Sequence, residues 1–320
     1  MAVTYTGTRP APFVSAAVQE YQSNELTAYR GLEIAKTFNS MTDKGTLPVV
    51  TREGQAGTGD GNTRRSPGST YNRDDIEAEG VSFQCLGYGH ETPLPDEEVA
   101  MYKSEFDAQV VAGVRNRVRI LTDLEVKIKN MALNTTTFNV TDGNFIDNKA
   151  APWATAGTDI LGQVDAGIDA MLAKGGLPNS IVIPRLLAKY LKTNTAIKAM
   201  LSGIAYPTLD QVAEVLRTYW NIPNIVFPGA VYNSAKKGQT ASMTDIWGDT
   251  YVNICRIAQG ESPSESCAFR TPIWQEMSGA DVAIKTYREE QTDSTIVKGK
   301  MFYDELVVDK FQGYLMQVKA

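Results

Sequence analysis

The chain has 320 residues, of which 42% are hydrophobic, so it can bury a substantial core in two domains or in one elaborated domain. Its formal net charge is −6 and its 31 basic residues are spread along the sequence, which argues against a dedicated nucleic-acid-binding surface. Three unclustered cysteines, no signal-peptide pattern and no long apolar run disfavour a disulfide framework, a zinc site, secretion and a membrane span.

The first 40 residues are predicted to form an N-terminal arm. Residues 1–20 are rich in Thr, Pro, Ala and Ser and contain few large apolar side chains. They are therefore predicted to be extended and to be held by some other surface. The apolar residues from Asn24 to Ser40 recur at intervals that suggest a short, moderately amphipathic helix at the end of the arm.

A long β-hairpin with a glycine-rich tip is predicted over residues 41–86. Residues 47–50 indicate one strand, and apolar residues alternating with polar ones over residues 76–86 indicate the returning strand. The tip, residues 51–70, has no apolar side chain larger than Ala56 apart from Pro67, so it cannot form a core of its own. Ordering about 20 residues costs on the order of 20–40 kcal/mol of backbone entropy, which would require roughly 1,000 Å² of partner surface to offset.

Nucleotide binding by this tip is disfavoured. Asp60 stands where a phosphate-binding loop needs its lysine, and Asn62 stands at the last glycine position of the dinucleotide-binding pattern. Two alternatives remain for the tip. It is either a surface loop without a fixed structure or a projecting loop that becomes ordered on a neighbouring subunit.

Two helices are predicted next. Apolar residues three or four apart from Val99 to Met131 follow an acidic first turn and predict a long helix, which a break at Gly113 would divide into two pieces. A second helix is predicted over residues 158–175, because Thr158 is a suitable N-cap and the glycines at 175 and 176 form a natural stop.

Two units of turn and buried strand follow these helices. Residues 180–183 form the first predicted strand, and residues 225–227 form the second, behind a helix that opens with a capping box of Thr208 and Gln211. At least one further strand is predicted between Ile246 and Ile257. The end of the chain is predicted to be rich in strands, at residues 282–287, 295–308 and 311–318.

No pattern in the sequence indicates catalysis. The only histidine, His90, lies between Gly89 and Glu91 and is expected to be structural or solvated. The carboxylate pairs Asp74-Asp75 and Glu289-Glu290 lie in polar stretches and are expected to be solvated. No nucleophile elbow and no metal-ligand spacing is present. We therefore expect no enzymatic activity and no catalytic, cofactor or metal site.

The order of these parts resembles the major capsid proteins of tailed double-stranded DNA bacteriophages. The resemblance covers nearly the whole chain and rests on the arm, the glycine-rich hairpin and the long helix, together with Trp153-Ala154, Leu177-Pro178-Asn179-Ser180, Pro223-Asn224, Gly229-Ala230-Val231-Tyr232-Asn233 and Ile246-Trp247-Gly248-Asp249. No single element is specific, but their order and spacing are.

The resemblance implies an α+β fold with an N-terminal arm and an extended loop beside a peripheral and an axial domain. The peripheral domain would hold a spine helix and long strands, and the axial domain would hold sheet and helices. Mapped onto this chain, the implied parts are the arm at 1–40, the extended loop at 41–86, the peripheral domain at 87–175 and 268–305 with its spine helix at 158–175, and the axial domain at 176–267 and 306–320.

The resemblance also implies self-assembly into an icosahedral shell that encloses double-stranded DNA without reading its sequence. The expected location is the virion, with assembly in the host cytoplasm. The implied partners are other copies of the chain in hexamers and pentamers, a portal, a separate scaffolding protein because the chain begins with its arm, and, as an option left open, a decoration protein. No cofactor is implied. Encapsulin nanocompartments share this fold and are the alternative.

Intersubunit contacts are expected at the hairpin. Some relatives cross-link a loop lysine to an asparagine of a neighbour, but no lysine lies between Lys44 and Lys103 here, so no cross-link is expected from the tip. Opposite charges in the loop could instead form ion pairs between subunits that give register more than affinity. The candidate residues are Arg52, Asp60, Arg64, Arg65, Arg73, Asp74 and Asp75.

Overall fold

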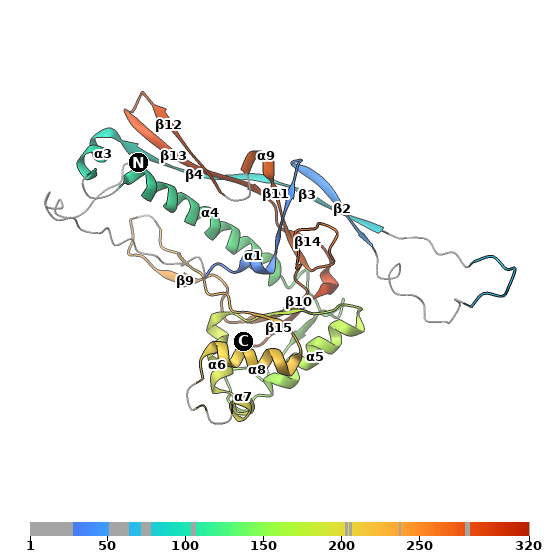
Figure 1. Cartoon of the computed structure of the whole chain (residues 1–320). Coiled ribbons are helices and arrows are strands. Elements are labelled where there is room, and N and C mark those ends of the chain that lie inside the picture. The colour runs from blue at the N-terminus through green and yellow to red at the C-terminus, as the bar shows by residue number, and fades with distance from the viewer. Residues whose placement is uncertain are drawn as a thin grey trace.

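A computed structural model of the chain describes residues 28–50, 64–71, 78–103, 107–201, 204, 207–236, 238–278 and 282–319. The described residues form a six-stranded sheet, a five-stranded sheet and two two-stranded sheets, with helices beside the two larger ones (Figure 1). This is the α+β class that the sequence predicts.

The six-stranded sheet is built around one long strand, β13. On one side β13 pairs with β4 over ten consecutive positions, and on the other side it pairs with β12. The long helix α4 (Ala108–Ala132) lies along this sheet and contacts both β4 and β13 (Figure 1). The strands are β1 (Thr37–Ser40), β4 (Leu86–Pro95), β11 (Phe269–Trp274), β12 (Ala283–Glu289), β13 (Ser294–Tyr303) and β14 (Leu306–Val307).

The five-stranded sheet is mixed and has the strand order β5-β15-β10-β6-β7. Its outer pairs, β5 with β15 and β6 with β7, are parallel, whereas β10 is antiparallel to both of its neighbours. Four helices pack with this sheet. The elements are β5 (Phe145–Asp147), β6 (Ser180–Val182), β7 (Asn224–Val226), β10 (Tyr251–Cys255), β15 (Gly313–Gln317), α5 (Ile160–Ala173), α6 (Arg185–Thr193), α7 (Thr195–Met200) and α8 (Leu209–Trp220).

The remaining elements are short helices and two hairpins. They are α1 (Gly31–Ile34), α3 (Asp96–Tyr102), α9 (Gln275–Ser278), the 3-10 helix η1 (Lys310–Gln312) and the paired strands β2 (Lys44–Val50) with β3 (Ala78–Gln84) and β8 (Val231–Asn233) with β9 (Met243–Asp245).

Local sequence signals are confirmed where a cap or a turn determines the backbone. The capping box at the start of α8 forms as predicted, because the Thr208 hydroxyl accepts from the Gln211 amide and the Gln211 side chain accepts from the Thr208 amide. Gly175 follows α5 with a φ of +74°, the left-handed conformation expected of a glycine that ends a helix. Both short buried strands, β6 and β7, are present.

The long helix breaks earlier than predicted. It ends at Tyr102 as α3 and begins again at Ala108 as α4, so Gly113 lies inside a helix instead of at a break. Asp107 starts the second helix by accepting hydrogen bonds from the amides of Gln109 and Val110 at 2.9 and 3.3 Å. Gly113 is buried, and a Cβ there would lie 3.6 Å from Ile284. An added Cβ would thus make an ordinary van der Waals contact, so the packing of α4 on the sheet does not require a glycine here.

The predicted helix at the end of the arm is largely wrong. Of residues 24–40, those up to 27 lie outside the described residues, and the rest contain only the four-residue α1 and then β1. β1 pairs in parallel with β11, and Phe38 is buried. Sheet pairing has overridden the helical spacing. Residues 31–40 thus belong to the folded body and not to an arm.

The helix predicted as the spine at 158–175 also has a different place. It forms as α5, but it contacts β15, and its buried residues pack in the core of the five-stranded sheet. A Cβ at Gly167 would lie 2.7 Å from Ile254 and 3.2 Å from Tyr314, so the helix approaches that sheet closely. The long helix of the six-stranded sheet is instead the 25-residue α4.

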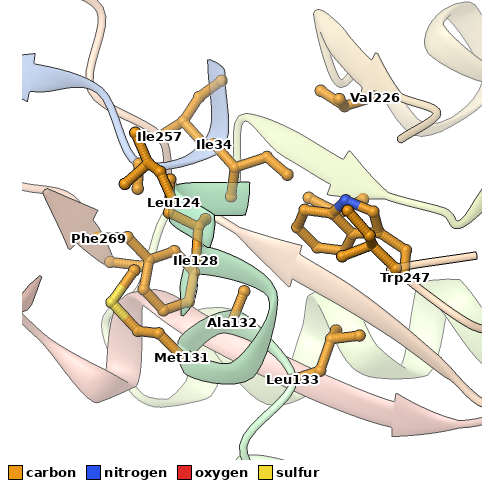
Figure 2. Close-up of a cluster of buried hydrophobic side chains, with 14 of the residues drawn as sticks. Ile34, Leu124, Ile128, Met131, Ala132, Leu133, Val226, Trp247, Ile257 and Phe269 are labelled. Carbon is orange, nitrogen blue, oxygen red and sulfur yellow. The ribbon is translucent and has the colours of Figure 1, made fainter. Parts of the chain in front are cut away.

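One hydrophobic core joins the two large sheets. Leu124, Ile128 and Met131 of α4 lie at its centre, with Phe269 of β11 on one side and Val226 of β7 on another (Figure 2). A second core lies between the five-stranded sheet and its helices. Because the first core draws side chains from both sheets, the two large sheets and their helices form one continuous body.

A buried carboxylate lies beside the first core. Glu125, on α4, accepts hydrogen bonds from the Gly31 amide at 2.8 Å, the Arg30 amide at 3.2 Å and the Trp247 indole nitrogen at 2.7 Å. Burial raises the pKa of this carboxyl, although the three hydrogen bonds favour its charged form. Glu125 therefore ties α1 and the loop before β10 to the long helix.

Replacing Gly31 with alanine should destabilise the subunit. The new Cβ would lie 2.5 Å from Glu125 Oε2 and 3.0 Å from Ile128 Cδ1, and overpacking of this kind costs about 1–3 kcal/mol. Urea unfolding of the unassembled subunit measures the change. Gly157→Ala is the matched control, because a Cβ there has no atom within 4 Å. Equal unfolding free energies for the two variants would contradict the close packing of Gly31 on Glu125.

Glu125→Gln should remove part of the pH dependence of stability. Because the folded-state pKa of Glu125 is raised, the folded chain retains this proton when the unfolded chain has lost it. The wild-type unfolding free energy therefore falls as pH rises from the ordinary glutamate pKa, about 4.3, to the raised one. The amide variant lacks this contribution, so the wild type gains stability relative to it on acidification. Unfolding curves from pH 4 to 8 test this, and a constant difference between the two proteins would exclude it.

Candidate intersubunit surface

The β2–β3 hairpin grows directly out of the six-stranded sheet. β3 is followed, after Cys85, by β4, so a single extended segment passes from the sheet into the hairpin (Figure 1). The Cys85 amide donates to the Asp43 carbonyl at 2.7 Å, and the Gln84 amide donates to Asp304 Oδ2 at 2.9 Å. These bonds fix the direction in which the hairpin leaves the body.

A small hydrophobic cluster holds the root of the hairpin. Phe83 of β3 meets Phe38 of β1 edge to face, with 5.7 Å between ring centroids, and Leu47 of β2 is buried beside them. Phe83 and Cys85 lie on the same face of the strand because strand residues alternate between faces, and both are buried. The root is thus a third core, separate from the two larger ones.

Beyond this root the hairpin loses its support from the body. Ala78, Glu79 and Gly80 of β3 are all exposed, as is Pro48 opposite Gly80. A two-stranded ribbon with no further layer is marginally stable in water. The outer half of the hairpin is therefore a surface that a second molecule could complete.

Only two of the predicted contact residues lie among the described residues. Arg64 and Arg65 are both exposed, whereas Arg52, Asp60, Arg73, Asp74 and Asp75 lie outside the described ranges. Arg65 Nε donates to the Ser69 carbonyl at 2.6 Å, and the Arg65 guanidinium lies 4.2 Å from the centroid of the Tyr71 ring. The expected ion pairs across subunits stay a prediction.

The described piece of the tip contains its own turn. The Ser69 amide donates to the Ser66 carbonyl at 3.1 Å, and Gly68 between them has a φ of +85°. With Pro67 before it, this is the residue pattern of a type II turn. The turn brings Arg65 beside Tyr71, and 73% of Tyr71 is exposed.

Tyr71 is a further candidate contact residue that the sequence analysis does not name, because it follows the polar run that ends at Thr70. The signal was nevertheless present, since a tyrosine inside a coreless loop has no apolar neighbour along the chain. Tyrosine and arginine are enriched among residues that dominate binding at interfaces.

His90 has a structural environment, in line with expectation. Its Nδ1 lies 2.9 Å from Asn116 Oδ1, and its Nε2 contacts Arg119. Because the Asn116 oxygen can only accept, Nδ1 donates and Nε2 accepts, which fits the neutral ring. Asn116 Nδ2 in turn donates to the Val297 carbonyl at 2.8 Å. The histidine thus belongs to a network that joins β4, α4 and β13.

Two of the cysteines and one of the predicted carboxylate pairs also lie in surroundings that do not activate them. Burial raises the pKa of the Cys85 thiol to about 11 and that of Cys255 to about 12, so both are protonated at neutral pH and are poor nucleophiles. Glu289 and Glu290 are exposed, as predicted. In the described part of the chain, no cluster of His, Cys, Asp or Glu is arranged to hold a metal ion, and no helix is long and apolar enough to cross a membrane.

Phe83→Ala should free the hairpin at its root without unfolding the body. Loss of a well-packed phenylalanine ring costs about 3 kcal/mol or more, and this cost falls on the third core alone. Hydrogen exchange of the β2–β3 amides should accelerate by roughly a hundredfold, while exchange in β10 and β15 stays unchanged. Ser82→Ala is the matched control, because Ser82 is exposed on the opposite face. Equal acceleration in all strands would show that the root is not a separate unit.

Comparison with known proteins identifies the fold through structure and not through sequence. Neither a protein-family model nor a curated protein matches the sequence. Many solved structures match the chain, and the three that follow are similar over nearly their whole length. A phage-related protein from Bordetella bronchiseptica has a TM-score of 0.67 at 18% identity, with 92% of this chain and 93% of that chain covered.

The other two structures are capsids. The capsid structure of the cyanophage P-SCSP1u gives a TM-score of 0.60 at 15% identity and covers 95% of this chain and 92% of that one. The capsid of Myoviridae phage XM1 gives 0.56 at 11% identity, with 95% of both chains covered. At such low identities the likeness establishes the fold alone. The chain has the α+β fold of phage major capsid proteins.

Proposed function

We propose that this chain is a major capsid protein, a structural protein whose copies assemble into an icosahedral shell around the double-stranded DNA of a tailed bacteriophage. The observation that carries the proposal is the β2–β3 hairpin, which is firmly rooted in the body but exposed along its outer half. In a chain with the capsid fold, such a ribbon is explained by a neighbouring copy that covers it.

The hairpin favours self-assembly for an energetic reason. Its root is anchored by backbone hydrogen bonds and by the third core, so the ribbon leaves the body in a defined direction. A ribbon with a fixed direction loses less conformational entropy on binding than a free loop does. A second copy of the chain can therefore supply the missing layer at a low ordering cost.

The chemistry of the described residues supports a structural role over an enzymatic one. His90 is engaged on both ring nitrogens, and the Cys85 and Cys255 thiols are buried. The net charge of −6 suits a container that confines DNA without binding its sequence. The proposed location is the virion, after assembly in the host cytoplasm.

The two large sheets support a proposed division of the subunit into two domains. The six-stranded sheet with α4 would form the peripheral domain, with α4 as the spine helix, and the five-stranded sheet with α5 to α8 would form the axial domain. The proposed partners are further copies in hexamers and pentamers, a portal, a separate scaffolding protein and, optionally, a decoration protein. With no lysine between Lys44 and Lys103, the contacts of the loop would be noncovalent.

Electron microscopy of the protein expressed alone and with its neighbouring genes tests this function. Closed particles that contain DNA, when the packaging components are present, are the expected result. Particles that hold a cargo protein would indicate an encapsulin-type compartment instead. A protein that stays monomeric under all of these conditions would refute the shell-forming role.

Deleting residues 54–68 should prevent assembly of the shell without preventing folding of the subunit. The subunit should remain folded because the deletion leaves the three cores intact, whereas shells should fail to close because the ribbon loses its tip. Circular dichroism reports folding, and sedimentation with microscopy reports assembly. A variant with a glycine-serine segment of equal length in place of residues 54–68 is the matched control for loop length, and it should also fail. Intact shells from either variant would refute the role of the tip.

A further inference from the structure

A cleft with three arginines lies at the edge of the five-stranded sheet. It has a volume of about 420 Å³ and is bounded by α1, the start of α6, one face of α8 and the edge strand β7. Arg30, Arg185 and Arg217 line it, one from each of the three helical regions. The cleft therefore has a concentration of guanidinium groups that the dispersed basic residues of the sequence do not suggest.

Two of these guanidinium groups have no ion-pair partner among the described residues, although the charge of Arg185 acts on the carboxyl of Asp245. Arg30 forms an ion pair with Glu33. Within the described ranges, neither Arg185 nor Arg217 has a carboxylate at ion-pair distance or a side-chain hydrogen bond. Asp210 also lines the cleft, but it lies in the first turn of α8, where the helix dipole stabilises a negative charge. The cleft is thus suited to an acidic group from outside the subunit.

An acidic face without a cation lies elsewhere on the same unit. Asp159, Asp165 and Asp169 come from α5 and its N-cap. Partial burial, together with the like charges of Asp169 and Asp159, raises the pKa of Asp165. The Tyr219 hydroxyl donates to Asp165 Oδ2 at 3.3 Å, but no lysine or arginine of the described residues pairs with these three carboxylates. Asp159 is engaged as the N-cap of α5, where it accepts from the Gly162 amide at 2.9 Å, but among the described residues no positive side chain offsets the mutual repulsion of the three carboxylates.

The arginine cleft and the acidic face lie on opposite sides of α8. Arg217 lines the cleft, whereas Tyr219 reaches Asp165 of α5. Two residues along a helix correspond to a rotation of about 200°, so the two side chains leave α8 in nearly opposite directions. α8 lies between α6 and α5 in Figure 1. One subunit thus presents opposite charges on two sides that cannot meet each other.

We propose that the acidic face of α5 in one copy docks against the arginine cleft of the next copy. This inference rests on the proposed function and specifies one contact by which the copies would associate. Because the two surfaces are different, the contact is heterologous, and its repetition closes a ring when the rotation between copies permits. Complementary charges of this kind accelerate association and set its register.

Charge reversal on each side tests the contact. Arg217→Glu should place a carboxylate against the acidic face of the neighbour, and Asp169→Arg should place a guanidinium against the cleft. Each single variant should slow assembly at low salt by roughly tenfold or more, measured by light scattering with microscopy of the products. Lys198→Glu is the control, because it reverses an exposed charge on α7 outside the cleft and should assemble at the wild-type rate.

Combining the reversals gives the decisive measurement. The double variant R217E/D169R restores opposite charges at every contact and should recover assembly, and an equimolar mixture of the two single variants should assemble better than either alone. Circular dichroism confirms that each subunit is folded. Normal assembly of both single variants, or no recovery in the double variant, would overturn the proposed contact while the shell-forming function stands. Failure of the wild type to assemble would instead refute the function itself.

Discussion

A single buried carboxylate joins parts of the molecule that are distant in the sequence. Glu125 lies within α4 and accepts hydrogen bonds from the backbone of Arg30 and Gly31 and from the indole of Trp247. A carboxylate in this setting is costly to bury unless its oxygens are satisfied, and its raised pKa reflects that cost. The first described helix and the loop before β10 therefore cannot leave α4 without exposing an unsatisfied charge.

The position of the projecting hairpin also depends on the contact between Glu125 and α1, because the chain that follows α1 leads to the root of the hairpin. α1 leads into β1, which pairs with β11 and carries Phe38 to the root of the hairpin. β4 continues the hairpin into the six-stranded sheet, where it pairs with β13 along its whole length. A ribbon that lacks support at its outer half is thus attached to the most extensively paired strands of the molecule, so its direction is set even though its tip is not covered.

Sequence reasoning succeeded where neighbouring residues decide the conformation and failed where distant residues do. The Thr208 and Gln211 capping box, the Gly175 stop and the strands β6 and β7 follow from local chemistry. The period of α5 shows that it has an apolar face but not which sheet that face meets, so its packing against the five-stranded sheet could not be predicted. The same limit hid the arginine cleft, because Arg30, Arg185 and Arg217 converge only through the fold.

The residues that stabilise the folded subunit differ from those that would contact other copies. The three cores are complete within one subunit, and their side chains are buried without help from a second copy. The outer hairpin is exposed, and neither Arg185 and Arg217 of the cleft nor the acidic face of α5 has an ion-pair partner among the described residues. A protein arranged in this way can fold first as a stable monomer and associate later. Its contacts with other copies can then be weak individually, because closure of a shell requires many of them to form together.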